Sequence, residues 1–140
     1  MVTEVIHAFG HPNIKANHPT TLMFTKDKQL TANGDCVVAV GADKSATDLS
    51  TEFKVALRQP NDKLTIIIEA NGLKEHIKAA GSPKLTLTNP IELVMRRSEY
   101  VSDRTLAILA DKASKDLQRA LIEKLKNPKQ EVKITLTVHY

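Results

Sequence analysis

The residues best suited to chemistry gather in one part of the chain, between positions 10 and 36. This stretch contains His11, His18, Asp35 and Cys36, together with asparagine and threonine side chains. Groups of these types bind metal ions, transfer protons or attack carbonyl and phosphoryl centres. We therefore treat the two histidines, the aspartate and the cysteine as candidates for a catalytic role.

A divalent metal ion such as zinc is one cofactor that His11 and His18 would suit. His7 lies four residues before His11, and an aspartate and a cysteine follow at positions 35 and 36, so three or four ligands of the zinc type are present. The spacing matches no standard motif such as Cys-x-x-Cys or His-Glu-x-x-His. In the alternative interpretation both histidines hydrogen-bond the backbone of their own loops, and a metal plays no part.

A nucleophilic role would use Cys36, activated by a histidine and with Asp35 as the group that orients it. Two features oppose this interpretation. Cys36 begins a short apolar run, where a single cysteine is usually a small core residue. Neighbours in a strand also point to opposite faces, so residues 35 and 36 share a pocket only if a bulge separates them. Asn33-Gly34-Asp35 is itself typical of a turn in which Asn-Gly supplies positive φ angles.

Anion binding is suggested by two Asp-Lys pairs, Asp43-Lys44 and Asp111-Lys112, each of which precedes an expected helix. Free N–H groups at a helix start, the helix dipole and a lysine together suit a phosphate. We nevertheless expect Asp43 and Asp111 to be N-caps, which would occupy those N–H groups. The residues that we select for ligand binding are Asn13, Thr20, Thr21, Lys44, Arg104 and Lys112.

An internal repeat positions these candidates. Residues 35–44 align with residues 103–112 after a three-residue shift in a loop, and the glycines and prolines of the two halves fall at equivalent places. Identical Gly, Pro and Asp residues at equivalent places indicate the same turns, because they set restricted backbone angles. We interpret the chain as one unit written twice, with repeat 1 at residues 1–71 and repeat 2 at residues 72–140.

Each repeat predicts the element order β-β-β-α-β. The expected strands alternate, or are short and apolar, and are rich in β-forming residues. They cover residues 2–9, 20–25, 36–40 and 63–69 in the first repeat and 73–80, 91–96, 105–109 and 131–139 in the second. Between the third and fourth strand of each repeat the apolar period becomes helical. Each helix is expected to begin after Asp-Lys and to stop before Pro60 or Pro128.

The predicted fold class is therefore mainly β (α+β). Four strands and one helix leave a sheet half covered, so the two units should close against each other as a pseudo-twofold β-sandwich or β-barrel with two helices packed outside. Only Asn71-Gly72, typical of a tight turn, joins the units. We therefore expect a single intertwined domain over residues 1–140.

Composition and charge limit the partners. Hydrophobic residues make up 41% of the chain and charged residues 26%, close to the averages for folded domains. No apolar run is long enough to cross a membrane, and the N-terminus lacks the features of a signal peptide. A single cysteine fits a reducing compartment, so we expect a cytoplasmic protein. Residues 1–71 hold seven Lys and Arg against eight Asp and Glu, whereas residues 72–140 hold thirteen against eight. The second half should therefore attract anions.

Three segments carry a resemblance to a known family. They are residues 10–22 (GHPNIKANHPTTL), residues 30–36 (LTANGDC) and residues 103–108 (DRTLAI) with 110–113 (ADKA). On these motifs the chain resembles an archaeal family catalogued as domain of unknown function 371, over nearly its whole length. The resemblance implies a small, mainly β fold of the jelly-roll or sandwich kind in an archaeal cytosol, and it implies no activity. Met23 stands where the family often has an acidic residue, which weakens a role for a carboxylate there.

The differences between the repeats point to function, because folding keeps turns and core alike while a site can specialise in one copy. His11 faces Ser82, His18 faces Asn89, and Cys36 faces Arg104. We therefore predict a binding module for a small anionic ligand or a nucleic-acid segment, which uses the polar loops of repeat 1 beside the basic repeat 2. The alternative is a hydrolase or transferase with a His/Thr/Asp/Cys site, with or without a divalent metal.

Overall fold

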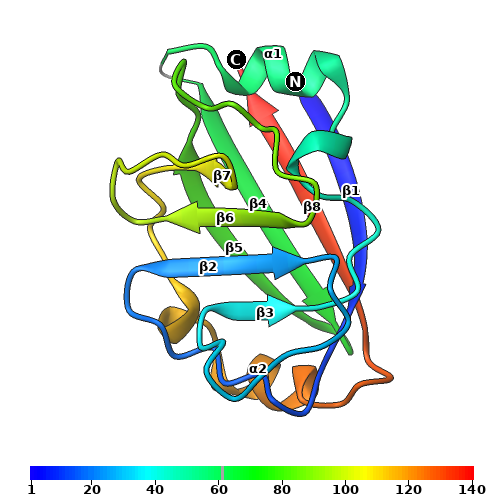
Figure 1. The fold of residues 1–140 in the computed structure, drawn as a ribbon. Coiled ribbons are helices and arrows are strands. Elements are labelled where there is room, and N and C mark those ends of the chain that lie inside the picture. The colour runs from blue at the N-terminus through cyan, green and yellow to red at the C-terminus, as the bar shows by residue number, and fades with distance from the viewer. Residues whose placement is uncertain (61) are drawn as a thin grey trace.

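Two four-stranded sheets face each other in the computed structural model, which describes residues 1–60 and 62–140 (Figure 1). The sheet with the longer strands, which we call the larger sheet, is antiparallel. Its order is β1 (Val2–Phe9), β8 (Glu131–His139), β4 (Lys63–Ala70), β5 (Leu73–Ala80). The smaller sheet has the order β3 (Val37–Ala39), β2 (Thr21–Thr25), β6 (Glu92–Arg96), β7 (Thr105–Ala107). Its central pair is antiparallel, and each outer strand runs parallel to its neighbour. The prediction of a mainly β (α+β) fold is confirmed.

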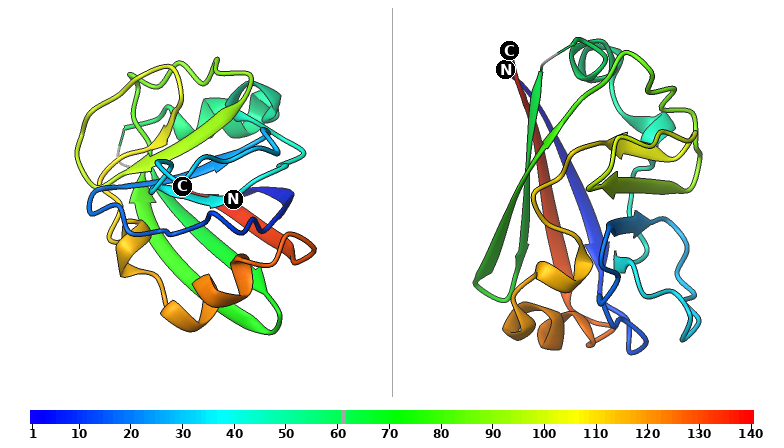
Figure 2. Two further views of the ribbon diagram at one scale, coloured as in Figure 1. Left: turned by 60° about the horizontal axis from the view of Figure 1, so that its bottom comes forward. Right: turned by 90° about the vertical axis from the view of Figure 1, so that its left-hand side faces the viewer.

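The core lies between the two sheets. Side chains alternate along the long strands, so that Val2, Glu4, Ile6 and Ala8 of β1 point inward and are buried. Strands β4 and β8 alternate in the same way. The three residues of β3 and the three of β7 are all buried. Among residues 1–60 and 62–140, no helix covers the opposite face of the larger sheet (Figure 2).

Two short helices close the ends of the sandwich, rather than lying on an outer face as predicted. Helix α1 (Thr51–Leu57) packs at one end and α2 (Arg119–Leu125) at the other, as Figure 2 shows from the side. Each directs three apolar residues into the core, which are Phe53, Ala56 and Leu57 in α1 and Leu121, Ile122 and Leu125 in α2. The helices therefore fill the two openings between the sheets.

The expected helix starts at Asp43-Lys44 and Asp111-Lys112 are wrong. In each half a 3-10 turn comes before the α-helix, at Ala46–Asp48 and Ser114–Asp116. A leucine in extended conformation follows each turn. The capping aspartates were also misassigned. Asp43 Oδ1 accepts the backbone N–H of His7 at 3.0 Å, and Asp111 Oδ1 accepts that of Lys78 at 3.0 Å. Both carboxylates therefore accept a backbone N–H of an edge strand of the larger sheet, and neither caps a helix.

The two halves of the chain interleave. Strand β1 pairs with β8, and β4 pairs with both β8 and β5, so each half completes the sheet of the other. The same order of elements occurs in residues 2–70 and in residues 73–139. Asn71 and Gly72 join β4 to β5 with φ angles of 51° and 78°, the tight turn that the Asn-Gly pair predicts.

The barrel alternative is wrong, because the described strands do not close into one sheet. At each side only one isolated bridge links the two sheets, Phe9 to Val40 and Ala80 to Ile108. Directly after these bridges the backbone turns into the left-handed region, at Gly41 (φ 60°) and Leu109 (φ 52°). An extended strand cannot continue through such a residue, so pairing stops there. Among the described residues, no helix has the length and apolar character to cross a membrane.

Candidate functional site

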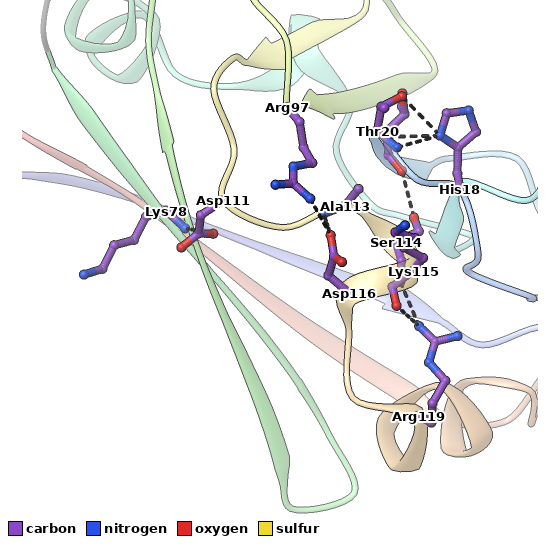
Figure 3. A network of polar contacts seen from close by, with 11 residues as sticks. His18, Thr20, Lys78, Arg97, Asp111, Ala113, Ser114, Lys115, Asp116 and Arg119 are labelled. Carbon is purple, nitrogen blue, oxygen red and sulfur yellow. Dashed lines mark hydrogen bonds and ion pairs between the residues drawn. The ribbon is translucent and has the colours of Figure 1, made fainter.

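The loop that enters β2 is built on the imidazole of His18. Its Nδ1 accepts the backbone N–H groups of Thr20 at 3.2 Å and Thr21 at 3.1 Å (Figure 3). A nitrogen that accepts these bonds carries no hydrogen, so the network assigns the hydrogen of the neutral ring to Nε2. Within residues 1–60 and 62–140, Nε2 has no hydrogen-bond partner. The ring therefore presents a free N–H donor.

The equivalent loop of the second half makes the same turn without a histidine. Asn89 Oδ1 accepts the backbone N–H groups of Ile91 at 2.9 Å and Glu92 at 2.8 Å. The turn thus requires only a side-chain acceptor. The remaining donor of Asn89, Nδ2, is satisfied by Asp103 Oδ2 at 3.2 Å. What distinguishes His18 from its counterpart is therefore a ring N–H that no other described residue accepts.

His11, like His18, accepts a backbone N–H of its own loop at Nδ1. Its Nδ1 accepts the backbone N–H of Asn13 at 3.0 Å, just as Ser82 Oγ accepts that of Lys84 at 3.1 Å in the second half. Asn13 is fixed in turn by a 2.6 Å bond from its Nδ2 to the carbonyl of Leu30. Both histidines therefore hydrogen-bond loop backbone, which leaves each ring an N–H donor and no free lone pair for a metal. The described residues contain no group of three or more His, Cys, Asp or Glu side chains that could hold a metal ion.

Basic residues of the second half flank the His18 loop. The backbone N–H of Lys115 donates to the carbonyl of His18 at 3.1 Å, and that of Arg97 donates to the carbonyl of Thr20 at 3.0 Å. Both side chains are exposed, as is Thr20, and Arg97 also pairs with Asp116 at 3.1 Å. In Figure 3 the Arg97 guanidinium points toward Asp116, so Arg97 and Lys115 contact the His18 loop through their backbones. Neither Lys115 nor Arg97 is among the site residues that the sequence predicts.

A comparison of the halves could have found Lys115. In the second loop the equivalent donors are Thr47, which bonds the carbonyl of Asn89 at 3.1 Å, and Lys26, which bonds that of Ile91 at 2.8 Å. One loop is therefore flanked by two cationic residues and the other by one. The signal was present in the alignment, where Lys115 falls on Thr47, but the alignment does not say which loop either residue meets.

Two further residues of the second half hold the first-half loops in place. The hydroxyl of Ser114, which is fully buried, lies 3.0 Å from the carbonyl oxygen of Thr21 and 2.7 Å from that of Cys36. Arg119 Nη2 donates to the carbonyl of Ala16 at 3.0 Å, where the backbone has a φ of 46°. These contacts join the His18 loop and its neighbouring segments to the second half of the chain.

Asp35 and Cys36 support the loop through their backbones. The carbonyl of Asp35 accepts the N–H groups of Asn17 at 3.0 Å and His18 at 3.2 Å. The thiol of Cys36 is half-buried against an apolar cluster that includes Met23. Burial raises the pKa of the Cys36 thiol, and the negative charge of Asp35 raises it further. A raised pKa leaves less thiolate, the form that acts as a nucleophile.

The turn at Asn33-Gly34 differs from its prediction. It forms through a 3.2 Å bond from the N–H of Gly34 to the carbonyl of Thr31, and neither Asn33 nor Gly34 has a positive φ. The Asn-Gly pair therefore supplies a turn here without the left-handed backbone that it adopts at residues 71 and 72.

The remaining candidates lie in other contacts. Lys44 Nζ pairs with Glu4 at 2.9 Å, and Lys112 Nζ pairs with Glu75 at 2.6 Å. Both carboxylates are buried, so an external anion would have to compete with them for the ammonium groups. Arg104 Nη1 pairs with Glu92 at 3.2 Å. No hydrogen bond or ion pair connects these three cations to His18 in the part of the chain that the structure describes.

Comparison with known proteins adds a family and a relative. A family model described as Domain of unknown function (DUF371) matches residues 6–139. An uncharacterized protein of Methanocaldococcus jannaschii is 44% identical over 126 residues, which cover 90% of this chain and 93% of that protein. Neither description states an activity.

Proposed function

The chain belongs to the family of domain of unknown function 371, and we propose that it is a binding module for a small anionic ligand held at the His18 loop. The observation that carries the proposal is the state of His18: Nδ1 accepts two backbone N–H groups, and Nε2–H is left as a free donor. A donor of this kind suits an anion, because anions accept hydrogen bonds.

The surroundings of His18 support an anionic ligand. The hydroxyl of Thr20 is exposed and lies 3.5 Å from His18 Nδ1. The exposed Lys115 comes from the half of the chain that has an excess of Lys and Arg, as does Arg97, which is paired with Asp116. Charge-assisted hydrogen bonds from such groups are stronger than neutral ones. Binding is favoured over catalysis, because a histidine whose Nδ1 is occupied and whose Nε2 is protonated offers no free lone pair to act as a base.

The matched variant His18→Asn tests the proposal. Asparagine at the equivalent position 89 supports the same turn, so the variant should fold while losing the free donor. We expect the affinity for inorganic phosphate, followed by NMR titration of backbone amides, to fall about tenfold. Lys115→Thr, which copies Thr47, should also weaken binding, whereas the control Lys26→Ala at the second-half loop should not.

Two results would contradict the proposal. One is a folded His18→Asn protein that binds phosphate as the wild type does. The other is a wild-type protein that binds a DNA duplex, with the steep salt dependence of phosphate-backbone contacts, but shows no saturable binding of inorganic phosphate. The second result would favour the nucleic-acid partner instead.

We further propose that the two halves, residues 1–71 and 72–140, arose by duplication of one unit and form one domain. Equivalent hydrogen bonds support this, since His18 and Asn89 build one turn and His11 and Ser82 build another. The common order of elements in the two halves supports it as well. The cytoplasmic location remains a prediction from the single cysteine.

A further inference from the structure

A pocket of about 280 Å³ lies at the end of β1 and is separate from the His18 loop. Its walls come from the end of β1, the segment after β2, the segment after β3 and the turn before β8. The residues that line it include Phe9, His11, Lys28, Val40, Gly41 and Pro128.

One side of the pocket is polar and cationic. His11 accepts the backbone N–H of Asn13 at its Nδ1, so its remaining ring nitrogen carries a hydrogen. Lys28 is exposed and forms no hydrogen bond or ion pair with another described residue. No acidic residue is among the described residues that line the pocket. This side therefore offers one charged and one neutral donor to an anionic group.

The other side is apolar and includes an aromatic ring. Phe9 remains 42% exposed although it is a large apolar residue, and Val40 and Pro128 stand beside it in the lining. An exposed aromatic face favours a flat apolar group, because aromatic pairs gain energy beyond the area that they bury. A ligand for this pocket thus combines an anionic head with a planar body.

The second half has no equivalent of this chemistry. At the matching positions Ala80 replaces Phe9, Ser82 replaces His11 and Glu99 replaces Lys28. The aromatic ring, the ring N–H and the positive charge are therefore all absent from the counterpart, and a carboxylate stands where the lysine would be. A structural role common to both halves does not explain the three residues of the first half.

Gly41 keeps the pocket open. A Cβ at this position would lie 3.4 Å from the ring of Phe9 and 3.7 Å from the Cγ of Lys28, so a longer side chain would extend between them. The second half has Leu109 at the equivalent position, with a φ of 52° that is close to the 60° of Gly41. This backbone conformation therefore accepts a leucine in the same fold, so the backbone alone does not require glycine at position 41. The absence of a side chain there leaves the space between Phe9 and Lys28 open.

We propose that this pocket binds a small aromatic anion, with its ring on Phe9 and its acidic group between His11 and Lys28. The volume is near the lower end for ligand pockets, which suits one ring and one head group. The proposal does not depend on the His18 loop.

Three probes test the class of ligand. Phenyl phosphate carries both features, inorganic phosphate only the head, and benzyl alcohol only the ring. Titrations followed by amide NMR should show phenyl phosphate shifting Gly10 and Gly41 and binding about tenfold more tightly at these residues than either other probe. The proposal is overturned if inorganic phosphate binds there equally well, or if phenyl phosphate shifts only Thr20 and Thr21. The latter result would leave the proposed function intact.

A second test replaces residues of the pocket by their counterparts in the second half. Gly41→Leu and Lys28→Glu should each weaken phenyl phosphate binding about tenfold or more, with a dispersed amide spectrum as evidence of folding. His18→Asn should leave binding at this pocket unchanged, which separates this proposal from the first. A folded Gly41→Leu protein that binds phenyl phosphate as tightly as the wild type would overturn the assignment of the pocket.

Discussion

At the residue scale, each of the two loop histidines uses one ring nitrogen to hold its turn and leaves the other without a partner among the described residues. The Nδ1 atoms of His11 and His18 accept backbone N–H groups, a task that Ser82 and Asn89 perform in the other half. The alignment of the halves correctly selected both positions as different. The alignment could not say which ring nitrogen accepts the backbone N–H groups, because a hydrogen bond to a residue two or three positions away depends on the geometry of the turn.

Lys44→Met tests the buried ion pair with Glu4. We expect the free energy of unfolding to fall by about 1–2 kcal/mol at pH 7, because the carboxylate loses its ammonium partner and keeps only the hydrogen bonds from Ser50. This is less than for a fully buried pair, since about a third of the Lys44 side chain is exposed. Urea unfolding measures the difference, and the exposed Lys133→Met is the control.

The pH dependence of this effect has a defined sign. Burial alone would raise the pKa of Glu4, but the hydrogen bonds from Lys44 and Ser50 outweigh burial and hold it below its usual value of 4.5. A carboxyl group with a lowered pKa in the folded state stabilises the protein above its unfolded pKa and loses this effect as the pH falls. The gap between wild type and Lys44→Met should therefore narrow below about pH 4.5. A gap that does not change with pH would contradict this account.

At the scale of elements, close packing between a helix end and a loop joins the two halves. Gly81 meets the carbonyl of Leu57 at the end of α1, and Gly10 meets that of Leu125 at the end of α2. The backbone N–H groups of Ser82 and His11 bond these same carbonyls at 3.0 Å and 2.8 Å. Glycine is required at both places because a Cβ would collide with backbone atoms.

Gly81→Ala should therefore lower the free energy of unfolding by about 2–3 kcal/mol, through collision with the carbonyl of Leu57 and loss of the Ser82 bond. Gly72→Ala is the matched control. A Cβ at Gly72 meets nothing within 4 Å, so its cost of about 1 kcal/mol comes only from the positive φ. Denaturant unfolding compares the two variants. Equal losses would show that the close approach at Gly81 is not a constraint.

At the scale of the whole molecule, neither half has the pairing partners that its strands require. The central pair of the larger sheet joins β4 of one half to β8 of the other, and the central pair of the smaller sheet joins β2 to β6. The inward side chains of both halves form one hydrophobic cluster. The candidate site also depends on both halves, because Lys115 and Arg97 of the second half bond the His18 loop of the first.

Peptides 1–71 and 72–140 test this interdependence. Each peptide alone should be largely unfolded in circular dichroism and NMR spectra, because β1 lacks β8 and β5 lacks β4. An equimolar mixture should recover the dispersed spectrum of the intact chain, since the cut falls in the exposed turn at Asn71 and Gly72. A folded monomer of either peptide alone, as judged by gel filtration, would contradict the interleaved arrangement.

The sequence by itself determined the strand positions, the turn at Asn71-Gly72 and the equivalence of the turns in the two halves. These features follow from alternation, β-propensity and restricted backbone angles, which act between neighbours along the chain. It placed the helix starts at Asp43 and Asp111, because an aspartate before an apolar period is typical of an N-cap. Tertiary structure overruled that expectation by offering both carboxylates the free N–H groups of edge strands.

Only the tertiary structure decided which strands pair, that two sheets form instead of a barrel, and which basic residues reach the His18 loop. It also decided that Lys44 and Lys112 neutralise buried glutamates. The physical reason is common to all four. Each depends on contacts between residues far apart in the chain, and the energy of such contacts is set by packing and burial, which local sequence patterns do not specify.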